Sequence, residues 1–283
     1  WNFADRGISQ SLALADLDGD GDLDVVLNNL NGEAGIYRNE SNAPRIAVRL
    51  RGPSPNTRGI GARIRVFDGA VPRQDQEMIC GGRYLSSDDA LRVFAAGSAT
   101  NRLRIEVTWR DGKRSFVSDA KPNHLYELDE GAGVLRNDRA AVADVGRTPS
   151  ALHSSASSLD PQPFFQEASV LLGHTHQDEA FDDFVRQPLL PKRLSQLGPG
   201  VSWFDLDGDG WDDLIVGSGK GGRLGVFRNH GRGGFKRLDE PPFNFPVTRD
   251  QTTVLGWRSP TQTLLLAGSS NYEDGLTIGG SVR

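Results

Sequence analysis

The chain has 283 residues, of which 37% are hydrophobic and 24% charged, and its formal net charge is −5. Its 34 glycines and 15 prolines suit a turn-rich β protein and argue against long helices. No run of 18 apolar residues is present, so we expect no membrane-spanning helix. Cys80 is the single cysteine, which excludes an internal disulfide bond; without a neighbouring Cys or His motif it is expected to be a small buried side chain.

The first distinctive element is an acidic loop at residues 16–24, which read Asp-Leu-Asp-Gly-Asp-Gly-Asp-Leu-Asp. Carboxylates occupy positions 1, 3, 5 and 9, and glycine occupies position 6. Calcium takes oxygen ligands at about 2.3–2.6 Å, which short aspartates in a tight loop can supply, and the glycine permits a turn with φ > 0. Unlike an EF-hand loop, which leads into a helix, this one continues into the strand-forming run Val25–Leu27. A plain Asp-Gly hairpin turn is the alternative.

The next segment, residues 45–131, alternates apolar and polar side chains. The alternation recurs over 46–50, 63–66 and 103–110, and Asp111-Gly112 then supplies a hairpin turn. Period-two alternation is typical of half-buried antiparallel strands with one face on a core. The segment therefore predicts a small antiparallel β-sandwich.

This segment is also basic, since residues 45–128 contain 15 Lys and Arg against nine Asp and Glu. Guanidinium groups suit sulfate and carboxylate, so an arginine-bearing face could bind an acidic glycan or an acidic protein surface. A solvated face, or one that docks on the acidic repeats of the same chain, is the simpler interpretation. No aromatic and basic platform indicates a nucleic-acid partner. The arginines of the candidate face are Arg49, Arg63, Arg65, Arg104 and Arg110.

Residues 132–165 are expected to form a flexible linker, because 140–160 are rich in Ala and Ser and poor in aromatic residues. His174 and His176 follow, with several carboxylates close behind. In a strand these two histidines would share a face and could bind a transition metal. Their spacing fixes no third or fourth ligand, so a structural or surface histidine pair is the default.

The acidic loop then recurs at residues 205–213 as Asp-Leu-Asp-Gly-Asp-Gly-Trp-Asp-Asp. Ile36–Asn39 and Val226–Asn229 follow the two loops at nearly the same spacing, which argues against accidental turns. A degenerate third copy begins near Thr253, with residues 258–262 in place of the acidic loop, and should not hold calcium. We expect two Ca²⁺ ions. Their predicted side-chain ligands are Asp16, Asp18, Asp20 and Asp24 in one loop and Asp205, Asp207, Asp209 and Asp213 in the other, with a backbone carbonyl from Asp22 and from Trp211.

The acidic loops and their flanks resemble FG-GAP/VCBS repeats, the calcium-bearing blades of integrin-α-like β-propellers. The segment between them resembles the ASPIC/UnbV domain of secreted cartilage-acidic-protein-like proteins. The residues that carry this second resemblance are 59–66, 76–77, 81–86 and 107–112, whereas 93–97 depart from the usual turn of the family. Residues 182–199 look like bacterial members that join such a domain to further blades.

The resemblance implies an all-β protein with propeller-type blades at 1–44 and 166–283 and a sandwich at 45–131 between them. A propeller needs about four to eight blades, so the chain is expected to be an internal fragment of a longer protein.

These observations favour a non-catalytic, calcium-binding interaction or adhesion module. Calcium loops of this kind suit an extracellular, periplasmic or cell-surface setting, where millimolar calcium fills weak sites. The sequence contains no nucleophile elbow, phosphate-binding loop or Cys-His constellation. The alternative is part of a secreted polysaccharide- or ester-acting enzyme, with catalytic residues outside this fragment or near His174 and His176.

Overall fold

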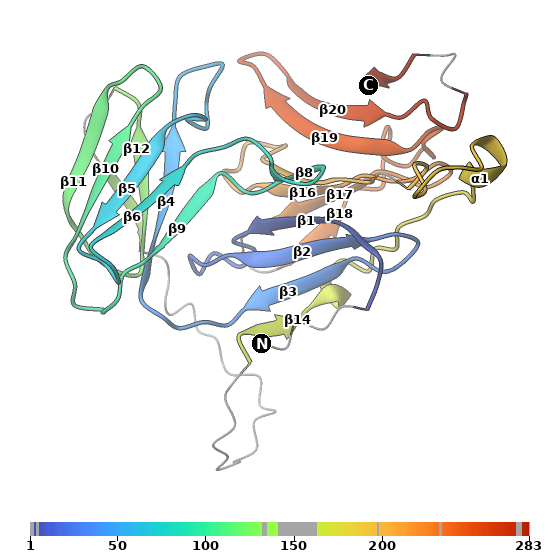
Figure 1. Cartoon of the computed structure of the whole chain (residues 1–283). Helices are drawn as coiled ribbons and strands as arrows, with labels where there is room; N and C mark the ends of the chain where they lie inside the picture. The colour runs from blue at the N-terminus through green and yellow to red at the C-terminus, as the bar shows by residue number, and fades with distance from the viewer. Residues whose placement is uncertain are drawn as a thin grey trace, which may run out of the picture.

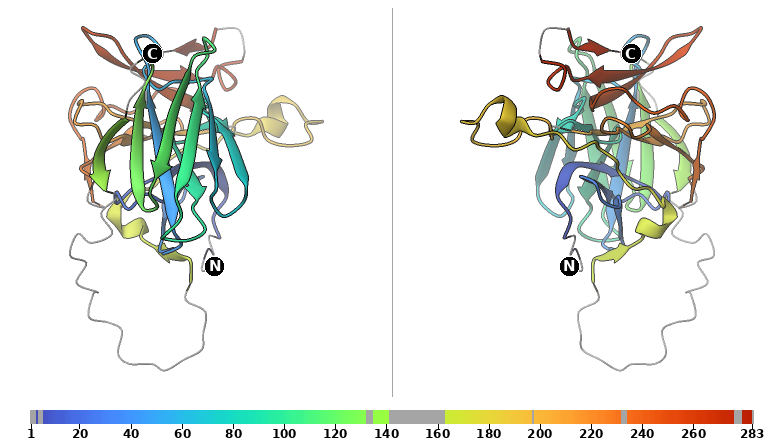
Figure 2. Two further views of the ribbon diagram at one scale, coloured as in Figure 1. Left: turned by 90° about the vertical axis from the view of Figure 1, so that its left-hand side faces the viewer. Right: turned by 90° about the vertical axis from the view of Figure 1, so that its right-hand side faces the viewer.

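The computed structural model describes residue 3 and residues 6–131, 135–140 (backbone only), 163–196, 198–231, 234–275 and 279–282. This part of the chain is built from five β-sheets. Its helices are a single 3-10 turn, η1 (Ser169–Leu171), and α1 (Asp183–Arg186), which projects from the molecule away from the sandwich (Figures 1 and 2). The predicted all-β class is confirmed. No helix in the described ranges has the length and hydrophobicity needed to cross a bilayer.

Two four-stranded sheets form a β-sandwich at one side of the molecule (Figure 1). One sheet has the order β11-β10-β5-β6 and the other β13-β12-β4-β9. The strands are β4 (Arg45–Arg51), β5 (Arg63–Phe67), β6 (Arg73–Glu77), β9 (Leu91–Ala95), β10 (Leu103–Thr108), β11 (Arg114–Ala120), β12 (His124–Asp129) and β13 (Leu135–Ala140).

The apolar positions of the period-two pattern form the core of this sandwich. Val48 of β4, Ile64 of β5 and Val107 of β10 are fully buried in one cluster that joins the two sheets. Antiparallel pairing is confirmed for most neighbours, but β12 runs parallel to β4. The strands of the opposite sheet lie between β4 and β12 in the chain, so no hairpin forces β12 to return in the opposite direction.

The two acidic-loop repeats form two further sheets with matching strand order. The first contains β1 (Ser9–Ala15), β2 (Asp24–Asn29), β3 (Gly35–Asn39) and β14 (Phe165–Glu167). The second contains β15 (Val201–Phe204), β16 (Asp213–Val216), β17 (Gly225–Asn229) and β18 (Phe235–Arg237). Consecutive members of each set pair antiparallel. The sandwich is therefore inserted between the third and fourth strands of the first repeat.

A short hairpin from the sandwich segment, β7 (Gly82–Arg83) and β8 (Ser86–Ser87), extends the second repeat sheet. Its strand β8 lies parallel to β15. The inserted domain is thus tied to the second repeat by backbone pairing as well as by side chains.

The degenerate third copy forms a sheet of β19 (Gln251–Arg258), β20 (Thr263–Ser269) and β21 (Ser281–Val282). The first strands of the three repeat sheets are neighbours, since β1 contacts β15 and β15 contacts β19. Apolar residues such as Ile36 and Trp203 bury the contact between the first two sheets. Figure 1 shows the three sheets layered beside the sandwich. The described residues do not close into a ring.

Two expectations need correction. The expected linker, 132–165, contains strand β13 and the first residue of β14, and residues 141–162 lie outside the described part. Cys80 is exposed rather than buried. The chain leaves the sandwich core at Met78, which is fully buried, and the next residue, Ile79, is already exposed on the way to β7.

Candidate metal centres

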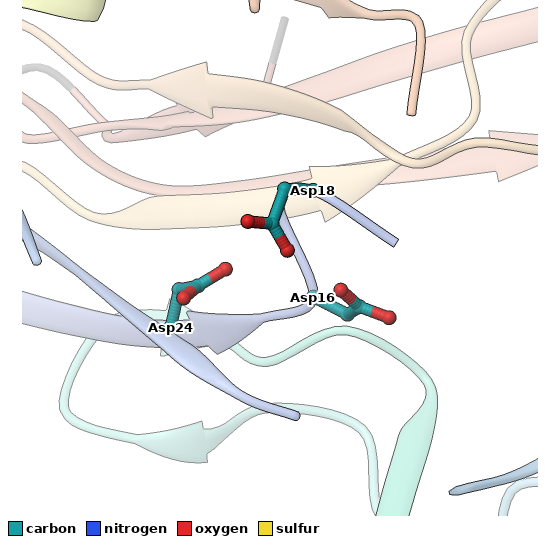
Figure 3. Close-up of side chains that lie close together, drawn as sticks. All are labelled: Asp16, Asp18 and Asp24. Atoms are coloured by element: carbon teal, nitrogen blue, oxygen red, sulfur yellow. The ribbon is translucent and has the colours of Figure 1, made fainter. Parts of the chain in front are cut away.

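The first acidic loop connects β1 to β2 and gathers three of its carboxylates (Figure 3). Asp16, Asp18 and Asp24 each place one carboxylate oxygen within 4.8 Å of the other two. Two oxygens on opposite sides of a calcium ion are about 4.8 Å apart, because each lies about 2.4 Å from it. The three oxygens are therefore close enough to bind one ion together.

Backbone hydrogen bonds hold this loop in shape. Asp16 accepts from the N–H groups of Gly19 and Asp20 through Oδ1, at 2.8 and 3.1 Å, and from that of Gly21 through Oδ2, at 3.0 Å. Gly21, at position 6, has φ of +86°, as predicted for the turn, and its counterpart Gly210 has φ of +91°. A residue with a Cβ would strain this conformation.

The second loop connects β15 to β16 and repeats the arrangement. Asp205, Asp207 and Asp213 form the corresponding cluster, again with oxygens within 4.8 Å of one another. Arg258, the last residue of β19, donates to the backbone carbonyl of Asp205 at 2.6 Å. The third copy has no acidic loop of its own. Its Arg258, which stands where that loop would begin, stabilises the acidic loop of the second repeat instead.

The ninth aspartate of each loop is anchored by the same partner. Asp24 accepts from the N–H of Asn39 at 2.6 Å, and Asp213 accepts from the N–H of Asn229 at 2.9 Å. Each asparagine also donates its side-chain amide to the carbonyl of the residue before that aspartate. Each asparagine is the second residue of a repeated Arg-Asn pair at the end of β3 or β17, and it therefore closes its loop from the neighbouring strand.

The arginine of that pair contacts the third-position aspartate. Arg38 lies 2.7 Å from Asp18, and Arg228 lies 2.9 Å from Asp207. Sequence reasoning used these arginines to align the repeats but gave them no role at the site. Their constant spacing from the loops was the signal that could have assigned them.

The fifth-position residues lie outside both clusters. Asp20 and Asp209 instead accept from the backbone N–H groups of Asp22 and Trp211, at 3.0 and 2.8 Å. The structure thus brings together three of the four predicted side-chain ligands in each loop. The carbonyl ligands proposed for Asp22 and Trp211 stay a prediction.

Burial and mutual repulsion make these carboxyl groups hard to ionise. Burial, followed by the charges of neighbouring loop aspartates, raises the pKa of Asp16 to about 7. Burial is also the main cause that raises the pKa of Asp22 to about 9 and of Asp213 to about 6. Asp22 is 3% exposed, and its Oδ1 has no hydrogen-bond partner. Crowded carboxylate oxygens, one of them buried without a hydrogen-bond donor, are the ligands that a hard divalent cation would bind.

The basic sandwich docks on both loops. Arg45, the first residue of β4, lies 3.3 Å from Asp20 and 3.1 Å from Asp22 of the first loop. Arg49 pairs with Asp89 at 3.3 Å and donates to the carbonyl of Gly210 in the second loop at 3.5 Å. The insertion therefore contributes cationic groups to both acidic loops.

A second arginine strengthens the contact with the second loop. Arg58 pairs with Asp212 at 2.9 Å and donates to the carbonyl of Trp203 at 3.2 Å. Burial raises the pKa of Asp212 to about 6, and the charge of Arg58 opposes that rise. This pair joins the sandwich to β15 and the start of β16.

The five arginines predicted to share one face do not do so. Arg49 lies in the interface with the repeats, as expected if the basic face docks on the acidic repeats of the same chain. Arg63 and Arg65 lie on β5 and Arg104 on β10, in the other sheet of the sandwich. The alternation in β4 and in β5 is the same, but the two strands belong to opposite sheets, so their polar sides point away from each other.

His174 and His176 lie buried between the first two repeat sheets, at 4% and 1% exposure. Both ring nitrogens of His176 face backbone N–H donors, from Asn31 and Gly219, each at 3.0 Å. The ring of His174 instead packs edge-on against Phe227, at 5.5 Å between centroids. Neither histidine joins a group of potential metal ligands among the described residues. Both ring nitrogens of His174 are buried without a hydrogen-bond partner, but the metal interpretation finds no further ligand among the described residues, so the structural histidine pair stays the default.

We expect Arg58→Ala to lower the free energy of unfolding by about 1–3 kcal/mol, because it leaves Asp212 without its cation at a partly buried interface. Arg63→Ala is the matched control, since it breaks an ion pair with Asp75 in which the arginine is 57% exposed, and it should cost less stability than Arg58→Ala does. Urea unfolding of both variants measures the difference. Equal, small losses would show that the Arg58 contact does not hold the sandwich in place.

We expect His174→Gln to reduce the amount by which the free energy of unfolding falls between neutral and acid pH. Burial lowers the pKa of His174 from 6.5 to about 4, so only the unfolded chain gains this proton between those values. The neutral histidine thus stabilises the fold above pH 6.5, and up to about 3 kcal/mol of that stability is lost as the pH falls to 4. Urea unfolding at pH 7 and pH 4.5 checks this, with the exposed His230→Gln as control. An acid loss as large in His174→Gln as in the unmodified protein would refute the assignment.

The comparisons with known proteins bear on the sandwich. A search among curated proteins finds no significant match to the chain. Residues 52–135 match the model of the family described as ASPIC and UnbV. The match begins after β4 and ends at the first residue of β13, so it covers most of the sandwich and the β7–β8 hairpin, but none of the strands of the two acidic-loop repeats themselves. The part of the chain between the two repeats is therefore similar to the ASPIC and UnbV family, as the resemblance predicted.

Proposed function

We propose that this chain is a calcium-binding, non-catalytic interaction module in which FG-GAP/VCBS-type repeats carry an inserted ASPIC/UnbV sandwich. The observation that carries the proposal is the matched pair of three-carboxylate clusters. Each cluster lies between the first two strands of its repeat and is closed by the same Arg-Asn pair. A repeated ion site accounts for this match better than two unrelated surface turns do.

In this proposal, the clustered aspartates hold the ions, while Arg38 and Arg228 orient the third-position carboxylates. A bound ion supplies positive charge that relieves the repulsion among the loop aspartates. Ion binding to the folded loops alone would stabilise the protein by about 2.7 kcal/mol per site at a hundredfold excess over Kd. The role of calcium is therefore structural: it would hold the repeats and the docked sandwich as one platform.

We further propose that the three repeat sheets are consecutive blades of a β-propeller. Their first strands are neighbours, as the inner strands of adjacent blades are, and each full repeat has four strands. Further blades would come from outside these 283 residues. Calcium sites of this kind would suit a protein outside the cell, in the periplasm or on the cell surface, where millimolar calcium fills weak sites.

The partner surface proposed for this module is the outer side of the sheet β11-β10-β5-β6. Arg63 is exposed there and pairs with Asp75 at 2.6 Å, and Arg104 lies over the ring of Phe67 at 4.1 Å. An acidic protein or a sulfated or uronic-acid glycan would interact with these arginines.

Calcium should raise the melting temperature, and a chelator should reverse the rise, because only the folded loops assemble the ligands. Asp16→Asn and Asp205→Asn should each lose part of this shift, since each removes a carboxylate from one cluster. Asp119→Asn, at a carboxylate that is 66% exposed and outside the clusters, should keep all of it. Calorimetry with and without calcium measures the shifts. Loop variants that keep the full calcium effect would rule out the loops as the sites.

Arg104→Ala should weaken binding to a sulfated polysaccharide several-fold, because it removes an exposed guanidinium from the proposed surface. Arg51→Ala is the control, at an exposed arginine of β4 in the opposite sheet. Titration at low and at physiological salt measures both. If the unmodified protein does not bind the polysaccharide, or binds it equally well at both salt concentrations, the glycan is not the partner.

A further inference from the structure

Three more carboxylates meet at a place remote in sequence from both acidic loops. Asp178, Asp250 and Glu273 each place one carboxylate oxygen within 4.8 Å of the other two. Asp178 lies between η1 and α1, Asp250 directly precedes β19, and Glu273 follows β20. The first comes from the segment that leads from the first repeat to the second, and the other two come from the third repeat.

The cluster contains buried oxygens that nothing in the described chain satisfies. The side chain of Glu273 is 10% exposed, and its Oε1 is buried without a hydrogen-bond partner. The Oδ1 of Asp178 is buried in the same way. Asp250 is 8% exposed, and its Oδ1 accepts from the N–H of Lys220 at 2.9 Å. Buried carboxylate oxygens without donors are costly, so the arrangement indicates a missing ligand.

The available positive charge does not balance the three carboxylates. Within the described ranges, the only cationic side chain within 4.0 Å of them is Lys220, whose Nζ lies 3.5 Å from Glu273. The same amine is shared with Glu179, also at 3.5 Å, and is 38% exposed. Burial, then the charges of Asp250 and Glu273, raises the pKa of Asp178 to about 7. Net negative charge thus stays on the cluster whenever all three carboxyl groups are ionised.

The ligands are held on well-anchored backbone. Asp178 donates its N–H to Asn31 Oδ1, between β2 and β3, at 2.8 Å. It also packs directly on the turn between β16 and β17, where a Cβ on Gly219 would collide with the Asp178 side chain. The carbonyl of Asp250 accepts from the N–H of Ser270 at 2.9 Å, which ties the start of β19 to the end of β20. All three repeat sheets therefore converge on this point.

We propose that Asp178, Asp250 and Glu273 form a third site, for a hard divalent cation such as calcium, that joins the third repeat to the first two. Three carboxylates supply part of the six to eight oxygens that calcium takes, and water supplies the rest. The site uses no residue of the acidic loops, so it goes beyond the proposed function and does not depend on it. The ion would satisfy the buried oxygens and balance the charge that Lys220 leaves.

The test is to count bound calcium ions per chain by equilibrium dialysis with radioactive calcium, with circular dichroism to confirm folding. Glu273→Gln and Asp178→Asn keep the size of the side chain and should each bind one ion fewer than the unmodified protein. Glu179→Gln is the matched control, because Glu179 shares Lys220 but is 61% exposed and outside the cluster. It should bind as many ions as the unmodified protein.

A double variant, Asp16→Asn with Asp205→Asn, separates this inference from the proposed function. If this variant still binds an ion, and adding Glu273→Gln or Asp178→Asn abolishes that binding while circular dichroism shows a folded chain, the third site is supported. If the unmodified protein binds calcium but the folded double variant binds none, the third site is refuted and the loop sites stand. If it binds as many ions as the unmodified protein while Glu273→Gln loses one, the third site stands and the loop sites fail. Equal ion counts in the unmodified protein, Glu273→Gln and Asp178→Asn would overturn the inference, leaving a proton rather than an ion on the cluster.

Discussion

Crowded carboxylate charge at the junctions between sheets is the constraint on which the rest of this structure depends. Each acidic loop brings three aspartates together at the turn that joins the first two strands of a repeat. The chain opposes this charge with arginines from four other strands: Arg38 of β3, Arg228 of β17, Arg45 of β4 in the sandwich, and Arg258 of β19 in the third repeat. Burial first, and then the charges of neighbouring aspartates, still raise the pKa of Asp16 to about 7 and of Asp22 to about 9. A divalent cation bound at each loop would add to the positive charge of the arginines.

The position of the sandwich is complementary to the same charge. It is inserted between β3 and β14 of the first repeat, and β4 begins only a few residues after β3. The inserted domain thereby lies against both loops, where Arg45 contacts the first and Arg49 and Arg58 contact the second. A domain of net positive charge on repeats of net negative charge is a complementary arrangement within one chain. Several of its basic residues are used in this contact within the chain, so fewer of them are available to an external partner.

Much of this could be predicted from the sequence, because it depends on local patterns. Period-two alternation identified the sandwich core, and the spacing of aspartates and glycines identified both loops. The fourth strand of the first repeat, β14, could not be found, because it has three residues and no periodicity and lies more than a hundred residues from β3. The docking of Arg49 depends on which sheet β4 joins, and alternation alone does not specify that. Asp178, Asp250 and Glu273 converge only through the tertiary fold, so no sequence spacing reveals them.

The most direct test of the two loop sites is anomalous diffraction from crystals in which terbium replaces calcium. If the loops bind calcium, one strong peak should lie among the carboxylates of Asp16, Asp18 and Asp24, and another among those of Asp205, Asp207 and Asp213. Ordered loops with no peak at either position, at lanthanide concentrations that saturate calcium sites, would contradict calcium binding there. In that case the arginines alone would hold the loops, and the acidic repeats would be turns rather than ion sites.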